Sequence, residues 1–69
     1  MALTVKAWRK AKDITQEQMA DFLGVHVNTY INWENNPQKM SIENGIKICE
    51  FLEVDFDEVI FLPENATKV

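Results

Sequence analysis

The sequence has few of the residues that build disulfides, metal sites and membrane spans. It contains one cysteine, Cys49, and one histidine, His26, among 69 residues. A lone cysteine cannot close an internal disulfide, and with one histidine it makes no metal-ligand set. No apolar run approaches the roughly 20 residues that span a bilayer, and the N-terminus lacks the apolar segment of a signal peptide. We therefore expect a cytoplasmic protein without cofactor, metal, membrane or small-molecule partner.

Positive charge is also scarce. Seven Lys and Arg stand against eleven Asp and Glu, for a net charge of −4. A basic patch is the usual footprint of a nucleic-acid-binding protein, so this balance argues against one. The distribution is uneven, however, because residues 1–12 carry four bases and no acid. Such a cluster is compatible with a locally positive face and equally with an ordinary solvated helix face.

The composition that remains is that of one small folded domain. The chain has a mass of 8.0 kDa and is 46% hydrophobic, which is too apolar for disorder. Its length lies near the lower limit for an independent core and leaves no room for a second catalytic or sensor domain. We expect the domain over residues 1–62 and a short, polar, flexible tail over residues 63–69.

Capping and stop signals divide the chain into five helices. Thr15 and Gln18 form a capping box and Gly24 ends that helix. The expected helices run from Thr4 to Lys12, from Thr15 to Gly24, from Val27 to Asn35, from Ser41 as cap to Leu52, and onwards from Asp55 as cap with Glu58 three residues later. No segment alternates as a strand does, so a sheet is not expected and the fold class is all-α.

The fourth expected helix carries an apolar stripe. Ile42, Ile46, Cys49 and Leu52 recur at helical spacing, which predicts that they face the core. Cys49 is then a small buried hydrophobe, and no histidine is placed to activate it. The sequence offers no acid, base or nucleophile constellation, so an enzyme is not expected.

The stretch from Thr15 to Asn35 carries the functional signal. Two helices joined through Gly24 and a short turn match a helix-turn-helix, whose second helix lies in the DNA major groove. The stretch, TQEQMADFLGVHVNTYINWEN, resembles the phage repressor/Cro (Xre-like) helix-turn-helix family in its Thr-Gln-Glu opening, in Ala20 and in the Gly24-Val25 turn. Further matching residues are Arg9, Ile14, Tyr30, Trp33, Glu34, Asn35, Ser41 and the segment Leu52-Glu53-Val54.

This resemblance extends from Val5 to Val59. It implies a five-helix lambda-repressor-like domain that binds double-stranded DNA. It also implies a partly buried salt bridge between Arg9 and Glu34, which we interpret as structural.

The third helix is the expected reading element. Helical geometry places Thr29, Tyr30, Trp33 and Glu34 on an inward arc, and Asn28, Ile31, Asn32 and Asn35 on the opposite arc with Val27 at its edge. Asparagine amides can bond adenine, and an apolar side chain can contact a thymine methyl. Alternatively, these are ordinary residues of a wet helix surface.

His26 takes the position at which the resembled family usually has a serine or threonine cap. Histidine is a poor cap, and the family position implies either a base or phosphate contact or a solvent-facing ring. The predicted base-reading residues are thus His26, Val27, Asn28, Ile31 and Asn32.

A second group is predicted to contact phosphate. Gln16 resembles the family glutamine that binds phosphate and buttresses the first recognition residue, and a helix N-terminus favours phosphate there. Asn35, Asn36, Gln38 and Lys39 follow, at the end of the third helix and in the next loop. Asn36 stands where the family commonly has glycine, and we expect it to adopt the left-handed conformation that asparagine tolerates.

A dimer is expected because one recognition helix reads few base pairs. The candidate surface is the C-terminal region, where Phe51, Phe61 and Leu62 are available, although these side chains could equally close the core. The predicted function is a repressor that occludes a promoter as a homodimer on a palindromic operator. The alternatives are an antitoxin-type interaction module that binds a basic protein, and an activator that uses acids such as Asp13, Glu17 and Asp21.

Overall fold

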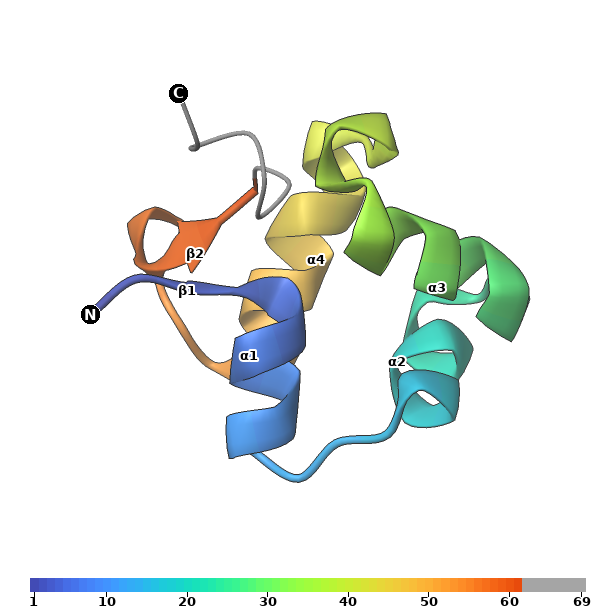
Figure 1. Ribbon diagram of the computed structural model, residues 1–69, viewed down its shortest axis with the longest axis horizontal. Coiled ribbons are helices and arrows are strands. Elements are labelled where there is room, and N and C mark those ends of the chain that lie inside the picture. The colour runs from blue at the N-terminus through green and yellow to red at the C-terminus, as the bar shows by residue number, and fades with distance from the viewer. Residues whose placement is uncertain (62–69) are drawn as a thin grey trace.

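Four α-helices and two short 3₁₀ turns dominate the computed structural model, which describes residues 1–61 (Figure 1). In chain order the elements are β1 (Leu3–Thr4), α1 (Val5–Ala11), α2 (Gln16–Leu23), α3 (Val27–Asn35), the 3₁₀ turn η1 (Pro37–Lys39), α4 (Ile42–Leu52), the 3₁₀ turn η2 (Phe56–Glu58) and β2 (Val59–Ile60). In Figure 1, α4 lies between α1 on one side and the α2–α3 pair on the other. Leu62 and the expected tail at 63–69 lie outside the described residues.

The helices begin at the predicted caps. The hydroxyl of Thr15 accepts from the amide of Gln18 at 3.0 Å, and the Gln18 side chain accepts in return from the amide of Thr15 at 2.8 Å. The Ser41 hydroxyl accepts in the same way from the amide of Asn44 at 3.1 Å. Each cap satisfies backbone donors that have no partner within the helix, and this fixes where the helix starts.

Three residues with positive φ end helices or turn the chain. Gly24 has φ 71° at the end of α2, which confirms it as the stop signal. Asp13, after α1, has φ 58°, a left-handed conformation that aspartate tolerates. Glu53 ends α4 with φ 60°, and no sequence signal predicted this.

The core lies where α1, α2, α3 and α4 meet. Tyr30, Met19, Ile48 and Leu52 are completely buried. The other members of this buried core are Val5, Ala20, Cys49 and Val59. Ala20 is a buried residue of α2, the helix that packs on α3, and its small side chain suits close helix packing.

The predicted core stripe of α4 is wrong at its N-terminal half. Ile42 is 74% exposed and Ile46 is 47% exposed, whereas Gly45 and Ile48 are buried. Both sets recur at helical spacing and share Cys49 and Leu52, so periodicity alone cannot separate them. The rotation of α4 is decided by its packing against α1 and α2, which draws in the Ile48 side.

The predicted fifth helix and the absence of a sheet are also wrong. Asp55 and Glu58 do form a capping box, but it holds only the single 3₁₀ turn η2. The chain then extends as β2 and pairs in parallel with β1, with Leu3 opposite Val59 and Thr4 opposite Ile60. Strand pairing satisfies backbone groups that a longer helix would have satisfied internally. Residues 1–61 therefore form a four-helix domain with one short parallel strand pair.

Candidate nucleic-acid interface

The turn between α2 and α3 has the expected helix-turn-helix geometry. Gly24, Val25 and His26 connect the two helices. The amide of Gly24 donates to the carbonyl of Asp21 at 3.2 Å, and that of Val25 donates to the carbonyl of Ala20 at 3.0 Å. These bonds close the end of α2 and begin the short turn that leads into α3.

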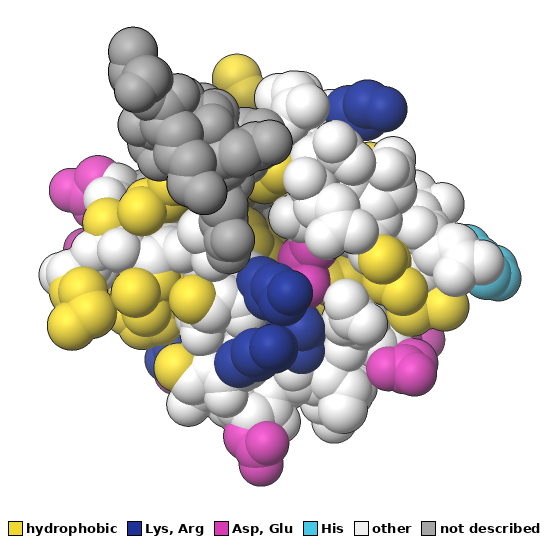
Figure 2. Space-filling model, in the orientation of Figure 1, with side chains coloured by type: hydrophobic (Ala, Val, Ile, Leu, Met, Phe, Trp, Pro, Cys, Tyr) yellow, Lys and Arg dark blue, Asp and Glu magenta, His cyan; other side chains and the backbone are white. Residues whose placement is uncertain are grey.

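The outer face of α3 is uncharged and rich in amides. Asn28, Asn32 and Asn35 are exposed, as predicted, whereas Tyr30 on the opposite face is fully buried. Thr29 was expected to face inward and is exposed instead, because the buried side of α3 is centred on Tyr30. Figure 2 shows the uncharged surface near the end of the molecule that carries the histidine, while dark-blue side chains gather over α1.

The two apolar candidates on α3 differ in their surroundings. Val27 and Ile31 are both half-buried. Val27 packs against the hydrophobic core, and this leaves less of its side chain to meet a base. Ile31 is not among the side chains packed on the core cluster of the described residues. Of the two, Ile31 is the more available apolar contact.

His26 caps α3 with its side chain. The ring atom Nδ1 accepts a hydrogen bond from the backbone amide of Asn28 at 3.1 Å, and the residue is exposed. The expectation that histidine would cap poorly is thus not met in the geometry. The cap holds His26 against the first turn of α3, beside Asn28.

Asn36 orients Asn32. Its side-chain nitrogen donates to the side-chain oxygen of Asn32 at 3.0 Å and to the backbone carbonyl of the same residue at 3.2 Å. Asn36 itself has φ −134°, so the expected left-handed conformation is wrong. The reason is Pro37, because a residue that precedes proline is driven toward extended backbone. No sequence pattern predicted this contact between the two amides.

A buried carboxylate ties the helices behind this face together. Glu34 accepts from Arg9 Nε at 2.6 Å and from Arg9 Nη2 at 3.3 Å, which confirms the salt bridge that the resemblance implied. The Tyr30 hydroxyl donates to Glu34 at 2.5 Å. Arg9 Nη1 also donates to the carbonyl of Ile14 at 2.8 Å. Side-chain exposure of only 9% for Arg9 and 1% for Glu34 makes this an internal connection between α1 and α3.

The network shifts the pKa values of its members in the directions that its geometry requires. Burial by itself would raise the pKa of Glu34, but hydrogen bonds from Arg9, Tyr30 and Gln16 outweigh it and lower the pKa. The bond to Glu34 raises the pKa of Arg9. Burial and the neighbouring carboxylate raise the pKa of Tyr30. Glu34 is therefore ionised and Tyr30 neutral at physiological pH.

Gln16 makes a different contact from the one expected. Its side-chain nitrogen donates to Glu34 at 3.2 Å, so it supports the buried carboxylate rather than the first recognition residue. It still occupies the first position of α2, where backbone amides point outward. The other predicted phosphate ligands, Asn35, Gln38 and Lys39, are exposed at the end of α3 and in η1.

The described part of the chain, residues 1–61, contains no candidate metal cluster and no membrane-spanning helix. No group of three His, Cys, Asp or Glu side chains within this span lies close enough to hold a metal ion. None of the helices within it is both long and apolar enough to cross a membrane.

Comparison with known proteins assigns the family. Residues 5–59 match the helix-turn-helix family model HTH_3. The chain is 39% identical over 51 residues to the cryptic phage CTXphi transcriptional repressor RstR of Vibrio cholerae serotype O1, covering 74% of this chain and 46% of that protein. A second RstR from Vibrio cholerae is 30% identical over 56 residues, covering 81% of this chain and 50% of the relative.

The chain spans about half the length of the curated relatives it matches. No solved structure is significantly similar to it. The match over residues 5–59 includes the helix-turn-helix and the buried salt bridge behind it. The chain belongs to the helix-turn-helix family, in its phage repressor/Cro (Xre-like) branch.

Proposed function

We propose that this chain binds double-stranded DNA in a sequence-specific manner and represses transcription by occupying a promoter. The observation that carries the proposal is the exposed amide face of α3, with Asn28 and Asn32 at its centre and the buried Tyr30 opposite. Asparagine offers a donor and an acceptor side by side, which matches the major-groove edge of adenine. The two relatives named as phage transcriptional repressors favour repression over activation.

The proposed base contacts are those of His26, Val27, Asn28, Ile31 and Asn32. Asn28 stands first among them because it is exposed and lies in the first turn of α3. In Asn32 the side-chain oxygen already accepts from Asn36. An oriented amide loses less freedom when it binds, which supports a specific rather than an adaptable contact.

The proposed phosphate contacts are those of Gln16, Asn35, Asn36, Gln38 and Lys39. Such contacts hold the protein in register on the duplex without reading its sequence. Lys39 is the one cation in this set, so few counterions are released on binding. We infer that the dependence of affinity on salt is shallow and that binding to random DNA is weak.

We further propose that the chain acts as a homodimer on a palindromic operator. Ile42, Ile46 and Phe56 are 74%, 47% and 48% exposed, which is unusual for large apolar side chains. Ile42 and Phe56 line an apolar groove of about 240 Å³ together with Gly45 and Phe61. Ile46 follows Gly45 directly on α4. This surface includes one of the three C-terminal residues expected at the dimer interface. Phe51 instead stacks on Phe22, 4.4 Å between ring centres.

The readout is tested by selecting bound sites from a random DNA pool and then measuring variants on the selected site. Asn28→Ala and Asn32→Ala are each expected to weaken specific binding about 5- to 150-fold, the range for one good amide–adenine contact. Binding to random DNA should change little. Glu50→Ala, an exposed position on α4, is the matched control. Folded variants with unchanged sequence preference would refute the assignment.

The phosphate contacts are tested through salt dependence. Lys39→Ala should weaken binding to all sequences alike and reduce the slope of log affinity against log salt by about one. Lys47→Ala removes the same charge from an exposed position in the middle of α4 and should leave the slope unchanged. Equal slopes for the two variants would remove Lys39 from the interface.

The dimer is tested by sedimentation. Ile46→Glu should yield monomers and weaken operator binding, because it places a charge in the proposed apolar interface. Lys47→Glu introduces the same side chain one position along α4 and should leave the dimer intact. Dissociation by both variants, or by neither, would contradict this interface.

A protein-interaction module is the second candidate, favoured by the net charge of −4. In this case the acidic surface binds a basic partner, as in an antitoxin. DNA selection separates the two candidates, because a module without DNA binding recovers no common site.

A further inference from the structure

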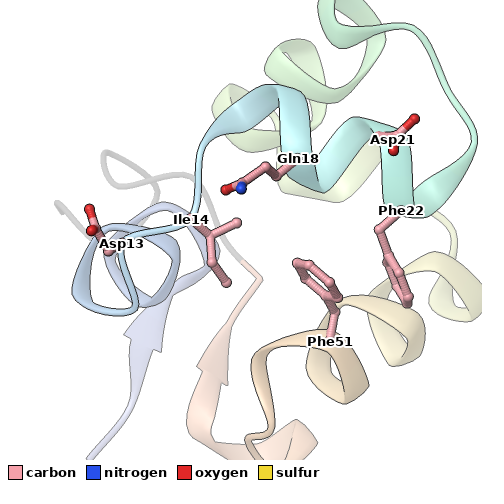
Figure 3. Close-up of a pocket in the computed structure, with 6 residues that line it drawn as sticks. All are labelled: Asp13, Ile14, Gln18, Asp21, Phe22 and Phe51. Carbon is pink, nitrogen blue, oxygen red and sulfur yellow. The ribbon is translucent and has the colours of Figure 1, made fainter.

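A groove lies between α2 and α4, on residues that the proposed DNA contacts do not use. It is lined by Asp13, Ile14, Gln18, Asp21, Phe22 and Phe51 and has a volume of about 470 Å³. We call these six residues the α2–α4 groove. Figure 3 shows that they come from the loop between α1 and α2, from α2 itself and from the C-terminal part of α4.

The floor of the α2–α4 groove is apolar and aromatic. The rings of Phe22 and Phe51 stack with their centres 4.4 Å apart and their planes 24° from parallel. Phe22 remains 46% exposed, and Ile14 is half-buried beside the pair. An exposed aromatic pair inside a concavity offers the kind of site where a partner buries an apolar side chain.

The rim of the groove is acidic. Asp13 and Asp21 are both exposed, and neither forms an ion pair with any residue of the described chain. No lysine or arginine is among the lining residues. In Figure 3 the two carboxylates lie on opposite sides of the group, with Ile14 and Gln18 between them.

Asp13 is held in place by its backbone. Its φ of 58° is accompanied by hydrogen bonds from its own amide to the carbonyl of Lys10, at 3.1 Å, and from the amide of Ile14 to the carbonyl of Arg9, at 3.0 Å. The Asp13 carboxylate therefore belongs to a turn whose backbone is held by hydrogen bonds. A partner that pairs with it does not have to order the loop first.

We propose that the α2–α4 groove binds a segment of another protein in which an aromatic or branched aliphatic side chain stands next to a lysine or arginine. The apolar side chain covers the Phe22–Phe51 pair, and the cation pairs with Asp21 or Asp13. The apolar side chain of the segment complements the exposed rings, and its cation complements the uncompensated negative charge of the groove.

A second copy of this chain does not fit the groove in the same way. A two-fold interface brings the same patch of both copies together. Asp13 and Asp21 of one copy would then face Asp13 and Asp21 of the other, without a cation in either lining. Like charges opposed in this manner disfavour the contact.

The groove leaves the proposed DNA interface unobstructed. None of its residues belongs to α3 or η1, and α2 contributes Gln18, Asp21 and Phe22 rather than Gln16. The segment and DNA can therefore bind together. This inference does not depend on the proposed function, because it holds whether or not α3 reads DNA.

The test uses a peptide of defined chemistry, acetyl-Arg-Leu-Phe-Arg-amide, titrated into the isotopically labelled chain and followed by NMR chemical shifts. The shifts should be confined to the α2–α4 groove. Acetyl-Glu-Leu-Phe-Glu-amide and acetyl-Arg-Gly-Ser-Arg-amide, which lack the cation or the apolar side chain, should each bind at least about ten-fold more weakly.

Variants assign the contacts. Asp13→Asn with Asp21→Asn should weaken the first peptide about four- to 25-fold, from about two- to five-fold for each exposed ion pair. Glu43→Gln with Asp57→Asn removes the same charge from exposed positions outside the groove and should leave affinity unchanged. Phe22→Ala should weaken binding about ten-fold. Should Phe22→Ala not fold, the two double variants still decide the question.

Three results would overturn the proposal. The first is equal loss of affinity in both double variants, which would indicate net charge alone. The second is a set of shifts centred outside the groove. The third is a change from dimer to monomer in Phe22→Ala by sedimentation, which would make the groove an interface between copies. Selection of DNA sites with the aspartate variants is a separate experiment. If it recovers no common site, the proposed DNA binding by α3 is refuted and the proposal for the groove is unaffected.

Discussion

Replacing Glu34 by glutamine tests the internal connection behind the recognition helix. The carboxylate accepts hydrogen bonds from Arg9, Tyr30 and Gln16, and only 1% of its side chain is exposed. Glutamine has nearly the same shape, but it offers one acceptor oxygen and turns an NH₂ group toward donors. The variant leaves Arg9 charged, 9% exposed, and without its ionic partner.

The expected loss is large for this small domain. Removing one partner of a buried ion pair costs about 3–5 kcal/mol. A chain of 69 residues is expected to have a total stability of about 3–10 kcal/mol. Glu34→Gln should therefore lose between about a third and all of its stability. If the loss approaches the total, DNA binding fails because the domain unfolds, although α3 itself is unchanged in sequence.

Urea denaturation of both proteins, followed by circular dichroism, measures this loss. Gln16→Ala is the control, since it removes one neutral bond of 3.2 Å to the same carboxylate and should cost about 1 kcal/mol or less. Arg9→Met with Glu34→Leu and Tyr30→Phe removes every charge together with the tyrosine hydroxyl, and it should be more stable than Glu34→Gln. A loss below about 1 kcal/mol in Glu34→Gln would refute the reasoning.

Three further predictions concern acid, glycine and the thiol. Because the pKa of Glu34 is lowered in the folded state, its contribution is present above the ordinary value of 4.5 and is lost as pH falls through the folded value; acid titration monitored by circular dichroism should show a smaller loss in Glu34→Gln than in the parent. In thermal unfolding, a change to alanine should lower the stability at Gly24 and raise it at Gly45. Gly24→Ala should destabilise by about 1 kcal/mol because its φ of 71° strains any side chain, although no atom lies within 4 Å of the added carbon. Gly45→Ala should stabilise by about 0.5–1 kcal/mol because the position is helical and Phe61 lies at an ordinary contact of 3.4 Å; stabilisation of both variants, or of neither, would contradict the conformational argument. Burial, with Asp55 nearby, raises the pKa of the Cys49 thiol, so a thiol reagent at neutral pH should label it slowly in the folded chain and rapidly in denaturant; equal rates would show that Cys49 is accessible.

Local sequence was sufficient to predict α2 and α3. The capping box at Thr15, the stop at Gly24 and the proline after Asn36 act within a few residues of the positions they control. The inward position of Tyr30 follows from helical periodicity in the same way. The salt bridge between Arg9 and Glu34 was available only through resemblance to a family, because the two residues lie on different helices.

The sequence predicted that several side chains of α3 and η1 are exposed, but not the contacts that support them. The exposed positions of Asn28, Asn32 and Lys39 agree with the expectation. The bond from Asn36 to Asn32 depends on the extended backbone before Pro37, and the bond from Gln16 to Glu34 crosses between two helices. The spacing of residues along the sequence does not predict either contact. The DNA contacts themselves stay predictions.

The sequence by itself determined where α2, α3 and α4 begin and which side of α3 is polar, because caps and periodicity are properties of neighbouring residues. Only the tertiary structure decided which apolar residues of α4 are buried. Ile48 and Ile46 are equally apolar, and contact with α1 and α2 buries the first and leaves the second 47% exposed. The tertiary structure also decided that a 3₁₀ turn and the strand β2 form where the sequence predicts a fifth helix. The strand β2 pairs with Leu3–Thr4, which lie far from it in the sequence, so neighbouring residues do not predict this pairing.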